Sequence, residues 1–234
     1  MPFPSTSILE TFTDTDGVDL TVHSSNWSIL GASLGITDGE IQGNAGTEST
    51  GDSANYWNVA NFGPDCEVYA TISTKPADDR SSYLGLRMKD ETASFGGYAV
   101  GLNAFAGTDT FGIYRIDNAV ATLLGSAVNQ EITNGDACGL QARSGTLELF
   151  YKATGGNWTS LTIQADSTYP NAGKIAVIWL TNTVRLDDFG GGSIPEMSPY
   201  MRRIRMIVAA IDYRRLNSLL VAFFRLPLSL RVST

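Results

Sequence analysis

Apolar and polar residues alternate with a period of two along most of the first 195 residues. Such alternation puts apolar side chains on one face of an extended segment and is typical of β-strands. The clearest segments are Ile8 to Thr13, Glu67 to Lys75, Tyr83 to Lys89, Tyr98 to Asn103, Phe111 to Ile116, Leu147 to Lys152, Ser160 to Gln164, Lys174 to Leu180 and Val184 to Phe189. No stretch here keeps a helical apolar period for three turns. We therefore predict an all-β protein, an antiparallel β-sandwich of about a dozen short strands.

Turn signals separate these segments, among them Asp16-Gly17, Gly96-Gly97 and Gly155-Gly156. Gly, Asn and Asp supply the positive φ angles that tight hairpins need. The segment Lys174 to Leu180 is apolar on both faces, so we expect it to be a central strand that is covered on both sides.

The last 38 residues differ in kind. Residues 1–196 hold 9 basic and 23 acidic residues, a net charge of −14, whereas residues 197–234 hold seven Arg and one Asp, a net charge of +6. All 24 glycines lie at or before Gly192. We predict a sandwich domain over residues 1–195 and a basic, apolar C-terminal extension over residues 196–234, with one or two helices between Tyr200 and Phe224.

Charge and hydropathy exclude some functions. An acidic domain does not suit nucleic-acid binding, so we expect no nucleic-acid partner. A membrane partner is also not expected, because no uncharged apolar run reaches the roughly 18 residues that a membrane span needs. The N-terminal residues MPFPSTSILETF lack the basic and apolar regions of a secretory signal, so we expect synthesis in the cytoplasm without export by that route.

The order of several short motifs resembles the concanavalin A-like lectin/glucanase superfamily, and within it the laminin-G-like jelly rolls of bacterial and phage proteins. The motifs are Phe12 to Gly17, Leu20 to His23, Ile41 to Asn44, Asp65 to Val68, Tyr83 to Arg87, Gly97 to Val100, Gly173 to Ile175 and Val184 to Phe189. The resemblance covers nearly all of residues 8–192 and implies two curved antiparallel sheets with adjacent terminal strands. It does not settle function, because this fold hosts lectins, glucanases, adhesion modules and virion proteins.

The glucanases of this superfamily carry catalytic carboxylates as Glu-x-Asp-x-x-Glu on one strand, and no such run exists here. Asp65, Glu67 and Glu148 are the faint candidates that remain for a hydrolase. We therefore expect no enzyme activity and no catalytic residues, with a glycan-active hydrolase and a secreted carbohydrate-binding module as alternatives.

Four carboxylates are candidates for a structural calcium ion, the one cofactor considered. Asp14 and Asp16 lie in an Asp-rich turn with some features of a calcium loop, although a turn bonded to its own backbone explains the pattern more simply. If the terminal strands pair, Glu10 and Asp188 could approach each other, where the resemblance implies a calcium site.

Three aromatic residues beside loops, Tyr56, Trp57 and Trp158, are candidates for stacking on sugar rings. The alternative is that Trp57 and Trp158 fill the ends of the core. The single histidine, His23, lies in an expected strand and is assigned a structural role.

Cys66 and Cys138 lie on the apolar faces of their strands. We expect two buried free thiols, with a disulfide between them as the alternative.

The extension is about 60% apolar, too much to stay solvated alone. We expect it to dock on another copy or on other virion proteins, against membrane binding or no function as alternatives. Candidate contact residues are Arg202, Arg203, Arg205, Ile207, Ile211, Arg214, Arg215, Leu219 and Phe223. The resulting hypothesis is a non-catalytic, multi-copy surface or tail protein of a phage-like virion, with a glycan as a further partner.

Overall fold

A computed structural model gives the fold of the chain and describes residues 2–30, 34–37, 40–42, 54–75, 82–89, 94–104, 107–178 and 183–195. The chain divides into two units, Met1–Ile194 and Pro195–Thr234. All elements below belong to the first unit. The predicted contact residues of the extension lie outside the described residues, so they stay a prediction, as does the domain boundary.

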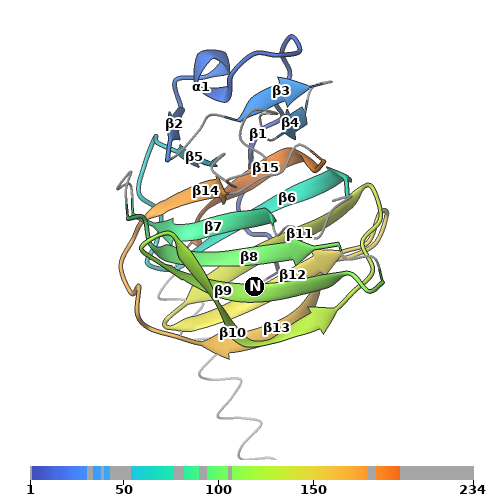
Figure 1. The fold of residues 1–234 in the computed structure, drawn as a ribbon. Helices are drawn as coiled ribbons and strands as arrows, with labels where there is room; N and C mark the ends of the chain where they lie inside the picture. Colours follow the sequence, from blue (N-terminus) through green and yellow to red (C-terminus); the bar gives the residue numbers. More distant parts are fainter. Residues whose placement is uncertain are drawn as a thin grey trace, which may run out of the picture. The chain divides into compact units, whose positions relative to one another are not determined.

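Two antiparallel sheets make up the first unit (Figure 1). The eight-stranded sheet has the order β13-β12-β11-β6-β15-β4-β3, and β1 also pairs with β15. Its strands are β1 (Ile8–Glu10), β3 (Gly35–Thr37), β4 (Glu40–Gln42), β6 (Cys66–Thr74), β11 (Asp136–Arg143), β12 (Thr146–Lys152), β13 (Thr159–Ala165) and β15 (Arg185–Ser193).

The seven-stranded sheet has the order β10-β9-β8-β7-β14-β5-β2. Its strands are β2 (Trp27–Ile29), β5 (Ala54–Trp57), β7 (Ser82–Met88), β8 (Gly97–Asn103), β9 (Thr110–Asp117), β10 (Val120–Asn129) and β14 (Lys174–Ile178). The one described helix is α1 (Leu20–His23).

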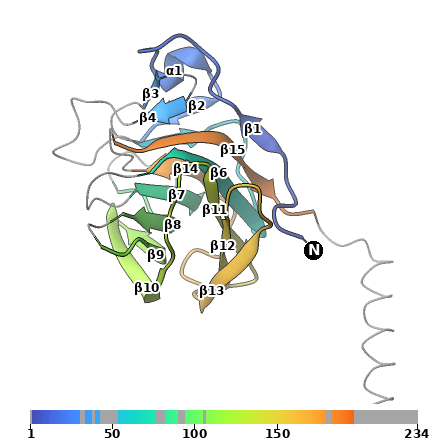
Figure 2. The same ribbon diagram turned by 90° about the vertical axis from the view of Figure 1, so that its right-hand side faces the viewer.

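The two sheets face each other as layers (Figure 2), and their inner faces form the main core. Fully buried Val68, Leu84, Phe111 and Phe189 come from both sheets. Hydrophobic burial between the layers is the principal stabilising contribution in such a sandwich.

A second cluster of buried apolar residues covers the outer face of the seven-stranded sheet. It contains Leu30, Ala54, Tyr83, Met88, Phe95, Ala99, Ile116, Ala176 and Ile178. As a result, every residue of β14 is buried, which confirms the prediction of a central strand covered on both sides.

The predicted all-β sandwich is confirmed, and each of the nine predicted strands corresponds to an observed one. One segment needs correction: Leu20 to His23, expected as a strand, forms a single helical turn. The amides of Val22 and His23 both donate to the carbonyl oxygen of Asp19, at 2.8 and 2.9 Å. Only Leu20 of this turn is buried, so the segment does not have the buried face that the alternating pattern predicted.

Residues 3–7, which we call the N-terminal strap, run along the outer face of the eight-stranded sheet. The Phe3 ring lies on Gly139 of β11, where a β-carbon would be 2.5 Å from the ring. Tyr69 of β6 donates from its hydroxyl to the carbonyl oxygen of Thr6 at 3.0 Å. Both contacts attach the strap to the two middle strands of this sheet.

Candidate functional site

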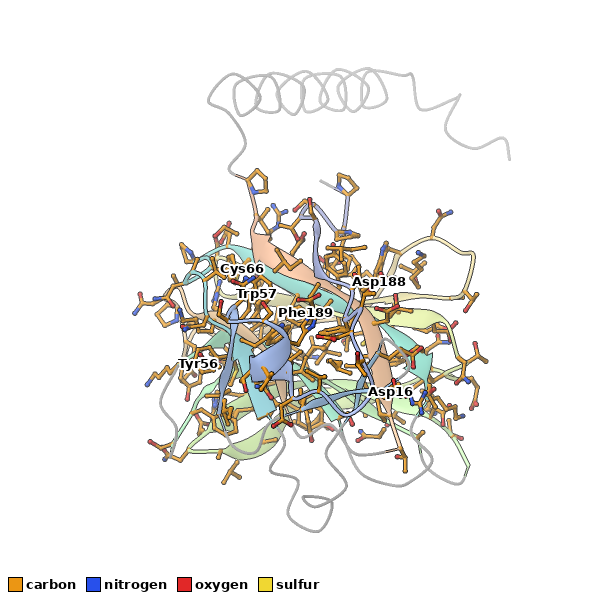
Figure 3. The ribbon with its side chains drawn as sticks, turned by 90° about the horizontal axis from the view of Figure 1, so that it is seen from above. Asp16, Tyr56, Trp57, Cys66, Asp188 and Phe189 are labelled. Atoms are coloured by element: carbon orange, nitrogen blue, oxygen red, sulfur yellow. The ribbon has the colours of Figure 1, made fainter. Side chains whose placement is uncertain are left out.

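The three aromatic residues proposed for sugar stacking lie in three different environments. Trp57 is 6% exposed and packs edge to face with Trp27, with ring centroids 5.2 Å apart. Trp158 is half-buried beside the strap, 4.9 Å from the Phe3 ring and 6.1 Å from Tyr69. Figure 3 shows Tyr56 toward the periphery and Trp57 among the packed side chains. This placement removes Trp57 from the candidate site, because a core residue cannot stack on a bound sugar.

Tyr56 lies instead on the outer face of the seven-stranded sheet, since adjacent residues of a strand point to opposite faces. A row of cross-strand partners crosses this face: Leu123, Tyr114, Ala99, Gly85, Ala176 and Tyr56. We call it the tyrosine row. Half-buried tyrosines stand toward its two ends, and small residues form its middle. The row therefore presents two aromatic side chains on one face of one sheet.

Next to this row, Tyr83 and Tyr114 form a perpendicular pair, with ring centroids 5.1 Å apart and an interplanar angle of 86°. Two glycines make room for the rings. A β-carbon at Gly101 would be 2.6 Å from Tyr114 and 2.7 Å from Tyr83, and one at Gly112 would be 2.9 Å from Tyr114. The absence of side chains at these positions lets the rings lie against the sheet.

A polar group completes this arrangement. The side-chain amide of Asn103 donates to the Tyr114 hydroxyl at 3.5 Å, and Asn103 is 4% exposed. An amide and a phenol beside an aromatic surface can exchange hydrogen bonds with a polar ligand while its apolar face stacks. We refer to Tyr114, together with the buried Tyr83 and Asn103 that contact it, as the tyrosine site. None of these three residues was singled out as a site candidate from the sequence, and Tyr56 lies four strands away on β5.

The charged groups at the neighbouring end of the sheet are paired with each other. Arg115 contacts Asp117 at 2.7 Å and Asp166 at 3.1 Å. Burial raises the pKa of Asp166, but hydrogen bonds from Tyr98, Thr168 and Arg115 outweigh it and lower the pKa to about 2. Tyr98 donates to Asp166 at 2.7 Å. These groups attach the β13–β14 connection to β8 and β9, which is a structural role.

The proposed calcium ligands Glu10 and Asp14 both contact His23. Its Nε2 lies 3.3 Å from Glu10, and its Nδ1 lies 3.0 Å from Asp14. Burial lowers the pKa of His23, but the hydrogen bonds to Asp14 and Glu10 outweigh this effect and raise the pKa above 6.5. The hydrogen bond from His23 in turn lowers the pKa of Asp14. We call this arrangement the His23 clasp.

The clasp does not suit a calcium ion. The second oxygens of Glu10 and Asp14 accept backbone amides, from Thr11 and Phe12 and from Thr15 respectively. Both carboxylates are thus already engaged, and a cation would compete with a histidine whose positive charge they favour.

The other two calcium candidates are Asp16 and Asp188. The terminal strands pair as expected, with Ile8 opposite Gly190 and Glu10 opposite Phe189. Asp188 accepts a hydrogen bond from Thr71 at 3.4 Å. Asp16 and Asp188 appear at separate points of the view in Figure 3. Within the described parts of the chain, no group of three or more His, Cys, Asp or Glu residues could hold a metal ion.

Glu67, a faint candidate for hydrolysis, is fully buried and anchors the N-terminal strap. Its Oε1 accepts hydrogen bonds from the backbone amides and hydroxyls of Ser5 and Thr6, and its Oε2 accepts one from Gln141 at 2.8 Å. Asp65 accepts the amide of Ser144 at 3.1 Å. Glu148 lies opposite Gln141, with that residue between it and Glu67. Glu67 therefore has a structural role, because it holds the N-terminal strap on the sheet.

Cys66 and Cys138 are buried free cysteines, which confirms the expected thiols and excludes the disulfide alternative in this fold. Burial raises the pKa of each thiol to about 12. No described helix is long and apolar enough to cross a membrane.

Comparison with solved structures establishes the class of fold. The chain is similar to the exoplasmic/lumenal domain of VIP36 in a Ca2+/Man-bound form, with a TM-score of 0.57 and 10% identity over 83% of this chain and 92% of that one. It is also similar to the xylan β-1,4-xylosidase of Bacillus halodurans C-125, with a TM-score of 0.52 and 14% identity over 81% of this chain but only 39% of the xylosidase. A CBM2 module of the evolved Dit of Lactobacillus casei BL23 phage J-1 gives a TM-score of 0.48 and 11% identity, over 70% of this chain and 81% of the module.

No protein-family model matches the sequence, and no curated protein matches it either. The solved structures show a concanavalin A-like jelly-roll fold for this chain, and its function has to be inferred from its own residues.

Proposed function

We propose that the protein is a non-catalytic glycan-binding β-sandwich and that the tyrosine site binds the sugar. The observation that carries this proposal is the Tyr83–Tyr114 pair, which lies against glycine positions with an amide beside it. A sugar ring has an apolar face that stacks on aromatic rings and hydroxyls that need hydrogen-bond partners. The tyrosine site offers both kinds of contact.

The fold supports glycan binding in general, without indicating which residues bind the sugar. VIP36 domains of similar fold were crystallised with Man, Man2 and Man3GlcNAc bound. The fold therefore accommodates glycan binding in those proteins. Placing a sugar on Tyr114 rests on the geometry of this chain alone.

A non-catalytic role agrees with the carboxylates. A glycosidase needs two carboxyl groups that flank the substrate, one of them able to donate a proton. Glu67 is buried under the strap, with both oxygens accepting hydrogen bonds, so a substrate has no access to it in this fold. The alternative of a glycan-active hydrolase would be supported by release of reducing sugar from a polysaccharide that binds.

A more specific hypothesis is that several copies of the protein lie on the surface of a phage-like virion and that the extension contacts other virion proteins. It is supported by the charge contrast between the acidic domain and the arginine-rich extension, since complementary charges favour docking. Labelling of purified virions with an antibody against this chain would support it, and absence of the chain from such particles would contradict it.

A glycan array probed with the full chain tests the proposed function. We expect a subset of glycans to bind, and we expect Tyr114→Ala to abolish binding to the same glycans. Trp158→Ala is the matched control, because Trp158 is a half-buried aromatic residue beside the other sheet. Loss of binding in Trp158→Ala alone would move the site to that sheet, and absence of binding to any glycan would contradict the proposal.

A further inference from the structure

The last strand of each sheet at one end of the sandwich carries no charge. β10, VATLLGSAVN, and β13, TSLTIQA, contain no Asp, Glu, Lys or Arg, and neither contains proline. β10 ends the seven-stranded sheet and β13 ends the eight-stranded one, and the two strands contact each other. Gly125 of β10 approaches Gln164 of β13, so closely that a β-carbon there would meet the Gln164 amide. Figure 2 shows both strands at the same end of the two layers.

Such an edge is unusual for a protein that stays monomeric. Free edge strands present unpaired backbone N–H and C=O groups, and monomeric proteins protect them with charges, proline, bulges or a covering segment. β10 is exposed along most of its length, and its apolar Val120 and Leu123 are 63% and 37% exposed. On β13, at the edge of the other sheet, Ile163 is 55% exposed. Among the described strands, only β9 pairs with β10.

The regular part of this edge is short and well defined. Val120 to Leu124 pair residue by residue with Asp117 to Ile113 of β9, and the register then shifts between Leu124 and Val128. Gly125 lies in that irregular part, with a φ of +74° that favours glycine. Bulges hinder pairing, so a partner strand would be expected on the segment from Val120 to Leu124.

We propose that this segment pairs with the same segment of a second copy, antiparallel across a two-fold axis that lies midway between the two Thr122 residues. Val120 then lies opposite Leu124 of the second copy, and Ala121 lies opposite Leu123. An antiparallel register that pairs even-numbered with even-numbered residues keeps the inner and outer faces of the two sheets aligned. The two seven-stranded sheets become one continuous sheet across the interface.

Charge favours a second copy as the partner. Residues 1–196 carry a net charge of −14, so two copies repel over most of their surfaces. The uncharged strands β10 and β13 allow close approach without opposing like charges in either layer. The segment is also self-complementary, as a two-fold interface requires.

The dimer would make the proposed glycan binding bivalent, a consequence that rests on the proposed function. Leu123 is the direct cross-strand partner of Tyr114, so each tyrosine site lies one strand from the interface. A two-fold axis perpendicular to the sheet leaves both outer faces on the same side. Two nearby sites on one side increase the avidity for repeated glycans.

Sedimentation equilibrium of the full chain tests the dimer without any glycan. We expect a dimer for the native sequence, a monomer for Thr122→Lys, and a dimer for Ser126→Lys. Thr122→Lys sets two lysines opposite each other across the axis, whereas exposed Ser126 lies in the irregular part of the same strand. A monomeric native chain, a dimer that survives Thr122→Lys, or equal dissociation of both variants would overturn the proposal.

Cross-linking gives a second measurement at the same position. Antiparallel partners have Cα atoms about 4.5–5.5 Å apart, within the range that a disulfide spans. We expect Thr122→Cys to form a covalent dimer with oxidised glutathione, which takes up the two electrons, and we expect Ser126→Cys not to do so. Cys66 and Cys138 are buried and should not interfere. Cross-linking of both variants, or of neither, would overturn the proposed register, whatever the glycan array shows.

Discussion

The ring of Phe3 stacks face to face on the ring of Phe150, with centroids 4.1 Å apart and planes at 3° to each other. Phe3 comes from the N-terminal strap and Phe150 from β12, so this contact joins parts of the chain that are far apart in sequence. Tyr69 and Trp158 meet the same ring edge to face. Trp158 thus contributes to holding the strap on the sheet.

Phe3→Ala should lower the free energy of unfolding by roughly 3 kcal/mol, because it removes a buried aromatic ring from a well-packed contact. Urea denaturation monitored by fluorescence would measure the change. Val59→Ala is the control, since Val59 is 61% exposed and its truncation should have little effect. Equal stability of Phe3→Ala and the native chain would show that the strap does not contribute to folding.

Glu67→Gln should destabilise the protein by roughly 1–3 kcal/mol, because a carboxylate that accepts several buried hydrogen bonds is replaced by an amide that donates on one side. Amide hydrogen exchange should become faster at Ser5 and Thr6, whose amides donate to Glu67. Glu148→Gln on β12 is the matched control and should leave both measurements unchanged. Unchanged exchange in Glu67→Gln would contradict the anchoring role.

The His23 clasp should make stability depend on pH. The folded-state pKa of His23 is raised above 6.5, so its contribution is fully present below that value and is lost as the pH rises through the folded pKa. The pKa of Asp14 is lowered below 3.8, so its contribution is present above 3.8 and is lost as the pH falls through the folded pKa. The clasp should therefore stabilise most between these two values.

The melting temperature of His23→Gln, compared with the native chain, measures this effect. We expect the difference to be larger at about pH 5.5 than at about pH 8.5.

We also expect the same melting temperature in calcium and in chelator, because the clasp carboxylates are engaged by His23 and by backbone amides. A melting temperature that rises with calcium would instead favour the ion at these carboxylates.

The two thiols should resist alkylation in the folded protein, because both are buried and their pKa values are raised to about 12. Mass spectrometry after treatment with iodoacetamide should show no adduct under native conditions and two adducts in urea. Rapid native modification of Cys66 would indicate that the segment around it opens.

Period-two alternation predicted the strands that have one apolar and one polar face, because burial on one side imposes that pattern. It did not identify β10, whose ten residues are largely exposed on both faces and therefore carry no clear alternation. It misassigned Leu20 to His23, where four residues are too few to distinguish a strand from a helical turn. Pairing of the terminal strands followed from the resemblance and is confirmed.

The site was less predictable, because cross-strand contacts depend on register. Tyr83, Asn103 and Tyr114 belong to three separate strands and come together only when those strands pair. The available sequence signal was a set of glycines within otherwise apolar strands, such as Gly101 and Gly112, which indicate close approach of other groups. Glu67 was named from the sequence as a faint catalytic candidate. Sequence alone could not reveal that the strap buries it.

A crystal structure of the full chain with an oligosaccharide that binds on the array would test the proposed function most directly. We expect a sugar ring stacked on Tyr114 at the outer face of the seven-stranded sheet, with a hydroxyl hydrogen-bonded to Asn103 or to the Tyr114 hydroxyl. A sugar bound at Trp158, or at any place away from the tyrosine site, would contradict the account.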